Sequence, residues 1–281
     1  MKVDSITQAQ DIFKNGSTTY FYSSLFFPDI MQQQVSDLYA FVRVADNYVD
    51  QVPQDQKGFK SFVREYSRAM KGDKSNNPVI DNFVRLSKEN RFDPEWTKAF
   101  LNAMESDLTK NRFKNLKEVE HYMYGSAEVI GLYLSRILKL DLEADPYARM
   151  LGKAMQYINF IRDIAEDIEL GRIYMPQSEL RKYGIATKEF TEHKLTSSLQ
   201  QNFQALVHAQ IERYYSWQNE AEKGFEFIPK RYLIPIKTAS EMYKYTAWRI
   251  YKNPQIIFEK KVKPSKRRIF SRAVLETLRP A

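Results

Sequence analysis

The stretch LGKAMQYINFIRDIAEDIELGRIYMP, residues 151–176, carries two helical stripes of different character. Apolar side chains recur at steps of three and four residues, and polar side chains recur every four residues on the opposite side. The apolar stripe comprises Ile158, Ile161, Ala165 and Ile168, and the polar stripe comprises Asn159, Asp163 and Asp167, with Gln156 close by. Gly171 suits a helix end, and Pro176 prevents early resumption. The pattern predicts an amphipathic helix from Asp145 to Glu169.

The acids of this helix lack lysine partners. Between Ala154 and Glu169 the only basic residue is Arg162, whereas other polar segments, such as LRKYGIATKEFTEHK, are rich in lysine. A solvated acidic face is the simplest interpretation of an amphipathic pattern. Stacked acids repel one another, however, unless a metal or a cationic ligand lies between them. Both interpretations stay open on this stretch alone.

A second polar stripe occurs in VSDLYAFVRVADNYVDQ, residues 35–51. It comprises Tyr39, Arg43, Asp46 and Asp50, which follow 4-3-4 spacing and share one helix face. If the two stripes face each other across a bundle, their four aspartates make an oxygen-only cage. Oxygen ligands without His or Cys favour Mg²⁺ or Mn²⁺, and an arginine in each stripe suits a phosphate-rich ligand. A di-iron bundle would need Glu-x-x-His pairs, which the sequence lacks.

The rest of the chain is typical of an all-α protein. Nine glycines and eleven prolines in 281 residues leave few helix breakers, and no block alternates as a strand would. Three- and four-residue apolar spacing predicts about eight long helices in one domain over residues 1–281. Their ranges are 29–50, 57–70, 78–88, 94–110, 116–138, 145–169, 195–227 and 229–251. Asp93–Pro94 and Asp145–Pro146 have the order expected at helix starts.

Composition excludes several classes of function. The chain has no cysteine, so thiol catalysis and Cys-zinc sites are excluded, and its three histidines show no metal-ligand spacing. No apolar run is long enough for a transmembrane helix, and the N-terminus has no signal-peptide core. The net charge of +8 concentrates in residues 252–281, where nine Lys/Arg and two Glu give +7. Such a tail suits nucleic acid, anionic lipid or a phosphorylated ligand, but no nucleic-acid motif accompanies it.

Together these blocks resemble the squalene/phytoene synthase family of head-to-head prenyl transferases. The similarity covers GSTTYFYSSLFFP with LYAFVRVADNYVD, then YMYGSAEVIGLYLSRIL, and most specifically LGKAMQYINFIRDIAEDIELGRIYMP. The segment GSAEVIG is similar to a variant found in phytoene synthases, which favours the longer prenyl substrate. Asn47 departs from the family pattern, because many relatives carry an aspartate there.

The resemblance implies an isoprenoid-synthase helical bundle around a central apolar cavity, with two prenyl diphosphates bound through Mg²⁺, or alternatively Mn²⁺. Implied metal ligands are Asp46, Asp50, Asn159, Asp163 and Asp167. The catalytic set comprises Asp46, Asp50, Asp163, Asp167, Tyr39 and Arg43. Implied substrate-binding residues are Ser17, Thr19, Tyr20, Tyr122, Gln156, Asn159, Arg162, Tyr243, Lys263 and Arg267.

The expected reaction joins two geranylgeranyl diphosphates through a cyclopropyl (prephytoene) diphosphate to give phytoene, the first step of carotenoid synthesis. No NADPH is expected, in keeping with the lack of a Gly-rich dinucleotide motif. Alternatives are squalene or dehydrosqualene synthesis from farnesyl diphosphate, a class I terpene cyclase, and a catalytically inactive relative. We expect a cytoplasmic protein that associates peripherally with membranes and does not bind nucleic acid; the sequence leaves its oligomeric state open.

Overall fold

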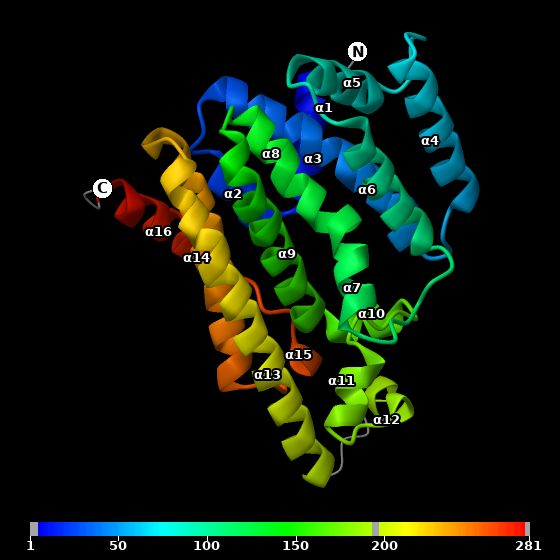
Figure 1. Cartoon of the computed structure of the whole chain (residues 1–281), viewed down its shortest axis with the longest axis vertical. Helices are drawn as coiled ribbons and strands as arrows, with labels where there is room; N and C mark the ends of the chain where they lie inside the picture. The colour runs from blue at the N-terminus through cyan, green and yellow to red at the C-terminus, as the bar shows by residue number, and fades with distance from the viewer. Residues whose placement is uncertain (1–4, 193–196, 279–281) are drawn as a thin grey trace.

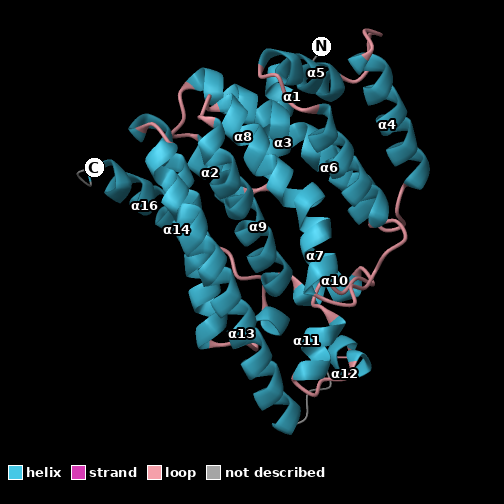
Figure 2. Ribbon diagram, viewed as in Figure 1, coloured by secondary structure: helices cyan, strands magenta, loops and turns pink. Residues whose placement is uncertain are grey.

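The computed structural model describes residues 5–192 and 197–278. Helices and loops make up this part of the chain, without a strand, as Figure 2 shows. The helices are α1 (Ser5–Gly16), α2 (Thr18–Ser24), α3 (Asp29–Asp50), α4 (Gln56–Met70), α5 (Pro78–Glu89), α6 (Pro94–Ser106), α7 (Leu116–Met123), α8 (Val129–Ile137), α9 (Asp145–Arg162), α10 (Ile164–Glu169), α11 (Gln177–Lys182), α12 (Thr187–Thr191), α13 (Ser197–Glu222), α14 (Lys230–Lys252), α15 (Ile256–Glu259) and α16 (Lys266–Leu278). The all-α prediction is confirmed.

Most predicted helices occur with ends shifted by only a few residues, but three predictions need correction. The predicted helix 116–138 contains a π-helix, Tyr124–Glu128, between α7 and α8. The predicted helix 145–169 breaks at Asp163, which separates α9 from α10. The predicted helix 94–110 ends at Ser106. The predicted start at Leu195 lies outside the described residues. The sequence patterns missed α1, α2, α11, α12, α15 and α16.

Helix capping explains several boundaries. Asp93 caps α6, because its carboxylate accepts a hydrogen bond from the Glu95 N–H at 2.9 Å. Asp145 is not a cap but the first residue of α9, where its carboxylate pairs with Arg136 at 2.5 Å. Gly171 follows α10 with φ of +76°, a left-handed conformation that glycine adopts without strain.

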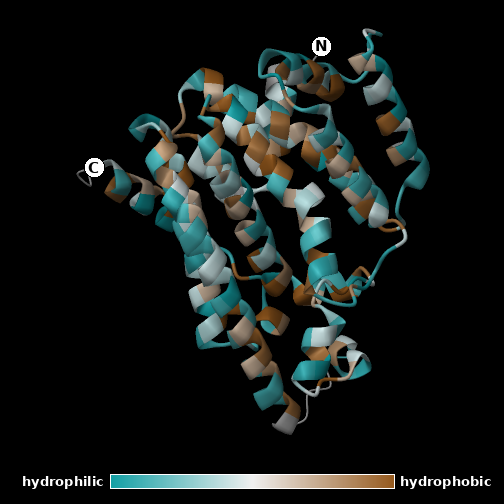
Figure 3. Cartoon of the chain, in the orientation of Figure 1, coloured by the Kyte–Doolittle hydropathy of each residue, from teal (hydrophilic) through white to brown (hydrophobic). Residues whose placement is uncertain are grey.

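Helix α9 lies in the middle of the bundle and packs against α8, α13 and α14 (Figure 1). Its approach to α8 depends on Gly131, where a Cβ atom would come within 2.0 Å of the Ala148 carbonyl oxygen. Figure 3 shows hydrophobic and hydrophilic residues interspersed along the helices, as expected for amphipathic elements. The close packing keeps one face of α9 turned toward the molecule's interior.

An apolar cavity of about 280 Å³ lies beside that face and is lined by residues of α2, α3, α8, α9 and α14. Helix α9 contributes Tyr147, Ala148, Leu151, Gly152, Met155, Gln156 and Asn159, and Ala144 lies just before its first residue. The central cavity expected from the sequence is therefore present. No helix in the described part of the chain is long and apolar enough to cross a membrane.

Candidate active site

Helix α3 presents Asp46 and Asp50 one turn apart, each beside an arginine. The Arg43 guanidinium donates to Asp46 Oδ2 at 2.6 Å, within the same helix. Arg172 comes from the loop after α10, donates to Asp50 Oδ1 at 2.6 Å, and also donates to the Val49 carbonyl. The predicted apolar face of α3 is buried behind them, since Ala45 and Val49 have no exposed surface. The first aspartate pair is thus held by the core on one side and by cations on the other.

The second aspartate pair lies at the break between α9 and α10. Asp163 leaves helical geometry (φ −99°, ψ 14°), yet its N–H still donates to the Asn159 carbonyl, and the Asp167 N–H donates to its carbonyl, both at 2.8 Å. The four-residue spacing therefore survives the break. After the break the buried apolar residue is Ile164, which the predicted stripe omitted, whereas the predicted Ala165 and Ile168 are only partly buried.

Two cations flank Asp163. Arg162 donates to both of its oxygens, at 2.7 and 2.5 Å, and Lys261 lies 3.2 Å from Oδ1. Lys261 also pairs with Glu166. This lysine belongs to the basic segment before α16, so the C-terminal part of the chain returns to the aspartates.

The acids remain short of positive charge. Burial and the charge of Asp50 raise the pKa of Asp46 to about 7. Burial, Asp163 and Asp50 raise the pKa of Asp167 well above its ordinary value. Within residues 5–192 and 197–278, the Asp167 carboxylate makes no ion pair or hydrogen bond, and the buried Asn159 Oδ1 accepts none. Both observations favour an additional cation at this site.

The expected four-aspartate cage is not formed by side chains alone. No three carboxylates or histidines of the described residues lie close enough to hold one metal ion. Separate pairs still fit Mg²⁺, which commonly binds one or two carboxylates and completes its coordination with phosphate oxygens and water. The donor set, with Asp46 and Asp50 on one side and Asn159, Asp163 and Asp167 on the other, fits an ion bound together with a diphosphate.

A buried polar cluster adjoins Asp50, and most of it was missed by sequence reasoning. Predicted Tyr122, on α7, donates to Asp107 Oδ2 at 2.5 Å, and Tyr174 donates to Oδ1 at 3.1 Å. Burial raises the pKa of Asp107 to about 6. Arg172 and Tyr174 lie in GRIYMP, at the end of the stretch 151–176, and that stretch was the only sequence signal for their place at the site. Asp107 lies outside every motif that the sequence patterns singled out for the site.

The remaining predicted residues divide into two groups. Tyr20, Tyr39, Gln156 and Asn159 line the apolar cavity, and the Tyr243 ring lies 5.6 Å from that of Tyr20. These residues connect the cavity with the aspartate pairs, because Asn159 belongs to both.

The other group forms no hydrogen bond or ion pair with the aspartates among the described residues. The Ser17 hydroxyl caps α2 by accepting from the Tyr20 N–H, and Thr19 occupies the first turn of that helix. Lys263 and Arg267 are exposed and form no ion pair with a described residue. Lys261, rather than these two, contacts Asp163.

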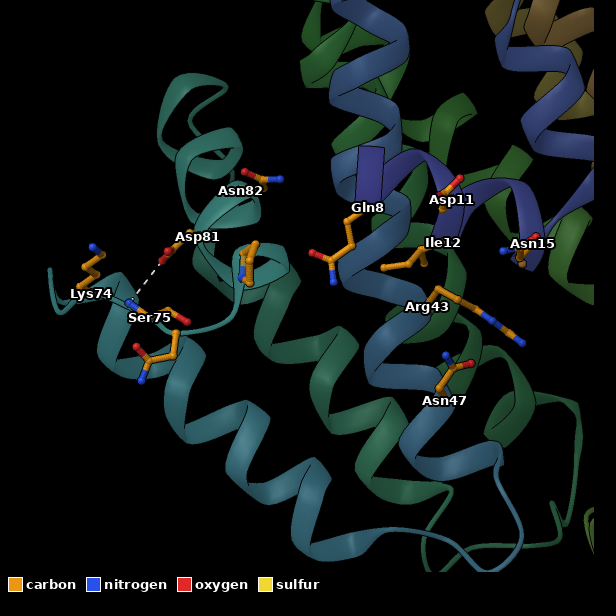
Figure 4. A pocket seen from close by; sticks show the side chains of 13 residues that line it. Gln8, Asp11, Ile12, Asn15, Arg43, Asn47, Lys74, Ser75, Asp81 and Asn82 are labelled. Carbon is orange, nitrogen blue, oxygen red and sulfur yellow. Dashed lines mark hydrogen bonds between the residues drawn. The ribbon is translucent and has the colours of Figure 1, made fainter. Parts of the chain in front are cut away.

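A broad polar cleft opens on the other side of Arg43. Its walls come from α1, α3 and the segment leading into α5, as Figure 4 shows. Asn47, the position where many relatives carry aspartate, lines the cleft together with Lys74 and Asp81. The two acids that line it, Asp11 and Asp81, are balanced by Arg43 and Lys74. The cleft therefore gives polar access to Arg43 and is not a second acidic site.

Comparisons with known proteins show which chains this one resembles in sequence and in fold. A chloroplastic phytoene synthase of an Oncidium hybrid is 30% identical over 60% of this chain, which spans only 42% of that relative. The 15-cis-phytoene synthase of Synechococcus elongatus is 22% identical over 92% of this chain and 87% of its own length. The crystal structure of a dehydrosqualene synthase superposes with a TM-score of 0.87 and 23% identity, covering 97% of this chain and 95% of that one.

The squalene/phytoene synthase family model matches residues 13–268, which include both aspartate pairs, the cavity and Lys261. The chain therefore belongs to the squalene/phytoene synthase family.

Proposed function

We propose that this chain condenses two geranylgeranyl diphosphates head to head, giving phytoene through a cyclopropyl diphosphate. Family membership and the acidic site beside an apolar cavity support a prenyl transferase. In the first step, C1 of one substrate bonds to the double bond of the other, with loss of diphosphate and a proton. In the second, the remaining diphosphate and another proton leave. Neither step consumes a reductant.

The length of the cavity supports a C20 substrate over a C15 substrate. Its lining on α9 runs from Asn159 to Tyr147, a span of twelve residues and therefore about 18 Å of helix. An extended chain advances about 1.25 Å per bond, so a geranylgeranyl group reaches about 19 Å and a farnesyl group about 14 Å. The longer group matches the full lining, whereas the shorter one leaves about the last 4 Å without contact.

Metal dependence is part of the proposal. Mg²⁺, or Mn²⁺, would be held by Asp46, Asp50, Asn159, Asp163 and Asp167, and would supply positive charge against the leaving diphosphate. Arg43, Arg162 and Lys261 supply further cations from the same surroundings.

The apolar cavity protects the carbocation that ionisation leaves behind. Its walls exclude water, which would otherwise quench the cation. Tyr20 and Tyr39 line it with aromatic faces that can stabilise positive charge without becoming nucleophiles. Burial raises the pKa of both phenols, so they stay protonated and neutral at physiological pH. The released diphosphate is therefore the better acceptor for the protons that the reaction loses.

The test is product identification after incubation with Mg²⁺ and either farnesyl or geranylgeranyl diphosphate. We expect a C40 hydrocarbon from the longer substrate without NADPH. A C30 product from farnesyl diphosphate alone would instead support the second candidate, a dehydrosqualene or squalene synthase, which the resemblance to the dehydrosqualene synthase structure favours.

A variant of the cavity sharpens this test. Ala148 lines the cavity eleven residues from Asn159, about 16 Å along α9, beyond a farnesyl chain but within reach of a geranylgeranyl chain. Ala148→Phe should therefore reduce turnover of the C20 substrate at least about tenfold and spare turnover of the C15 substrate. Ala148→Ser is the matched control and should retain both. Equal loss of both substrates in a folded Ala148→Phe protein would contradict the length argument.

A further inference from the structure

Helix α16 is buried on one face and unexpectedly apolar on the other. Ile269 and Ala273 have no exposed surface and attach the helix to the bundle. On the outward side, Phe270, Val274 and Leu275 are 39%, 51% and 52% exposed. Soluble surfaces scatter such residues singly, so three on one short helix face indicate contact with an apolar partner.

The apolar residues of α16 continue onto α2. The Phe270 ring lies 5.7 Å from that of Tyr22 and 6.0 Å from that of Phe26, and the neighbouring Leu25 is 40% exposed. Figure 1 shows α16 at the edge of the molecule beside α14, and Figure 3 shows hydrophobic and hydrophilic residues along it. We define the α2/α16 surface as Leu25, Lys266, Arg267, Arg268, Phe270, Val274 and Leu275.

Among the residues that the structure describes, the cations of this surface have no acidic partners. Lys266 lies 4.8 Å from the Tyr22 ring and Arg268 lies 4.0 Å from the Tyr245 ring, and neither they nor Arg267 pair with an acid among the described residues. The nearby Glu241 is already neutralised by Arg272 at 3.1 Å. Exposed apolar side chains among unpaired cations are complementary to lipid tails beneath anionic headgroups.

An aromatic belt extends the surface along α14. The Tyr245 ring, which Arg268 covers, stacks with that of Trp248, and Trp248 is 49% exposed. Tryptophan with one apolar and one polar edge is favoured at the level of lipid headgroups.

The surface and the apolar cavity share a wall. Ser23, Ser24 and Phe27, on and just after α2, line the cavity, while Leu25 on the same segment faces outward. From α14, Pro235 and Ala239 also line it. We propose that the α2/α16 surface docks on an anionic phospholipid bilayer, placing the cavity wall against the lipid into which an apolar product can partition.

Vesicle co-sedimentation without substrate tests this proposal independently of the proposed reaction. The protein should sediment with phosphatidylcholine vesicles that contain phosphatidylglycerol, less with pure phosphatidylcholine, and less at high salt. Val274→Glu with Leu275→Glu should weaken binding at least about tenfold, and Arg268→Glu should remove most of the salt-sensitive part. Lys60→Glu, at an exposed position on α4, changes net charge by the same −2 as either variant and should bind normally.

Folding and oligomerisation complete the test. The Val274→Glu, Leu275→Glu protein should keep the thermal unfolding midpoint and detergent-solubilised activity of the parent, since both side chains are exposed. Failure of the parent to bind anionic vesicles, or equal binding by this variant, would overturn the proposal. It would also be overturned if light scattering shows a dimer that the variant disrupts, because the surface would then join two copies of the chain.

Discussion

Replacement of Arg172 is the mutation whose effect on stability the structure constrains best. The Arg172 side chain is 5% exposed, donates to Asp50 and to the Val49 carbonyl, and lowers the pKa values of Asp46 and Asp107 by its charge. Arg172→Leu would remove the positive charge that these buried carboxylates share. Breaking a buried pair usually costs 3–5 kcal/mol, and because Asp50 is one-third exposed we expect about 2–3 kcal/mol at pH 8.

The stability that Arg172→Leu loses should increase as the pH rises. In the folded protein the pKa values of Asp46 and Asp107 are raised to about 7 and about 6, so the folded state binds more protons than the unfolded chain. The stability contribution of these groups is therefore complete below about pH 4 and is lost as pH rises through 6 and 7. Without Arg172 both pKa values rise further, so the free energy of unfolding should fall more steeply with pH than in the parent.

Urea unfolding with EDTA, at pH 5.5 and pH 8, measures this difference. We expect a deficit of about 2–3 kcal/mol at pH 8 that shrinks to about 1 kcal/mol at pH 5.5, where protonation removes the repulsion. Arg172→Lys keeps the charge but loses the forked donors, so its free energy of unfolding should lie between those of the parent and Arg172→Leu. A deficit that is the same at both pH values would refute the electrostatic reasoning and assign Arg172 a packing role.

Three further predictions concern the site and its scaffold. Asp163→Ala should reduce Mg²⁺-dependent turnover by at least about a thousandfold, measured as hydrocarbon formed; near-normal turnover would exclude Asp163 from the site. Lys261→Gln should raise KM for the prenyl diphosphate about tenfold, whereas Lys263→Gln should leave KM unchanged, and the reverse order would reassign the tail contact. Gly125→Ala should lower the free energy of unfolding by about 2–3 kcal/mol in urea titrations, because its Cβ would lie 2.3 Å from the Ala99 carbonyl oxygen; a smaller loss would show that α6 can move.

Much of the helical framework could be predicted because its cause is local. Apolar residues every three or four positions favour helix, and the range 29–50 agrees with α3 at both ends. The π-helix at Tyr124–Glu128 could not be predicted in this way, because the sequence around it keeps an ordinary helical pattern. Its one unusual feature, the close packing of Gly125 against α6, is visible only in the tertiary structure.

The residues of the site likewise divide into those predicted from local sequence and those found only in the structure. Spacing singled out Asp46, Asp50, Asp163 and Asp167, and the absence of neighbouring lysines added weight to Asp163 and Asp167; both are properties of the sequence. Their partners were not, because Arg172 lies 122 residues from Asp50 along the chain and Lys261 comes from a segment without helical periodicity.

The sequence by itself therefore determined the helices and the acids that they carry, since both depend on residues within a few turns of one another. Only the tertiary structure decided that the aspartates form separate pairs, which cations accompany them, and how far the cavity extends. These properties depend on how distant helices pack, and side-chain volume and close contacts such as Gly131 with Ala148 set that packing.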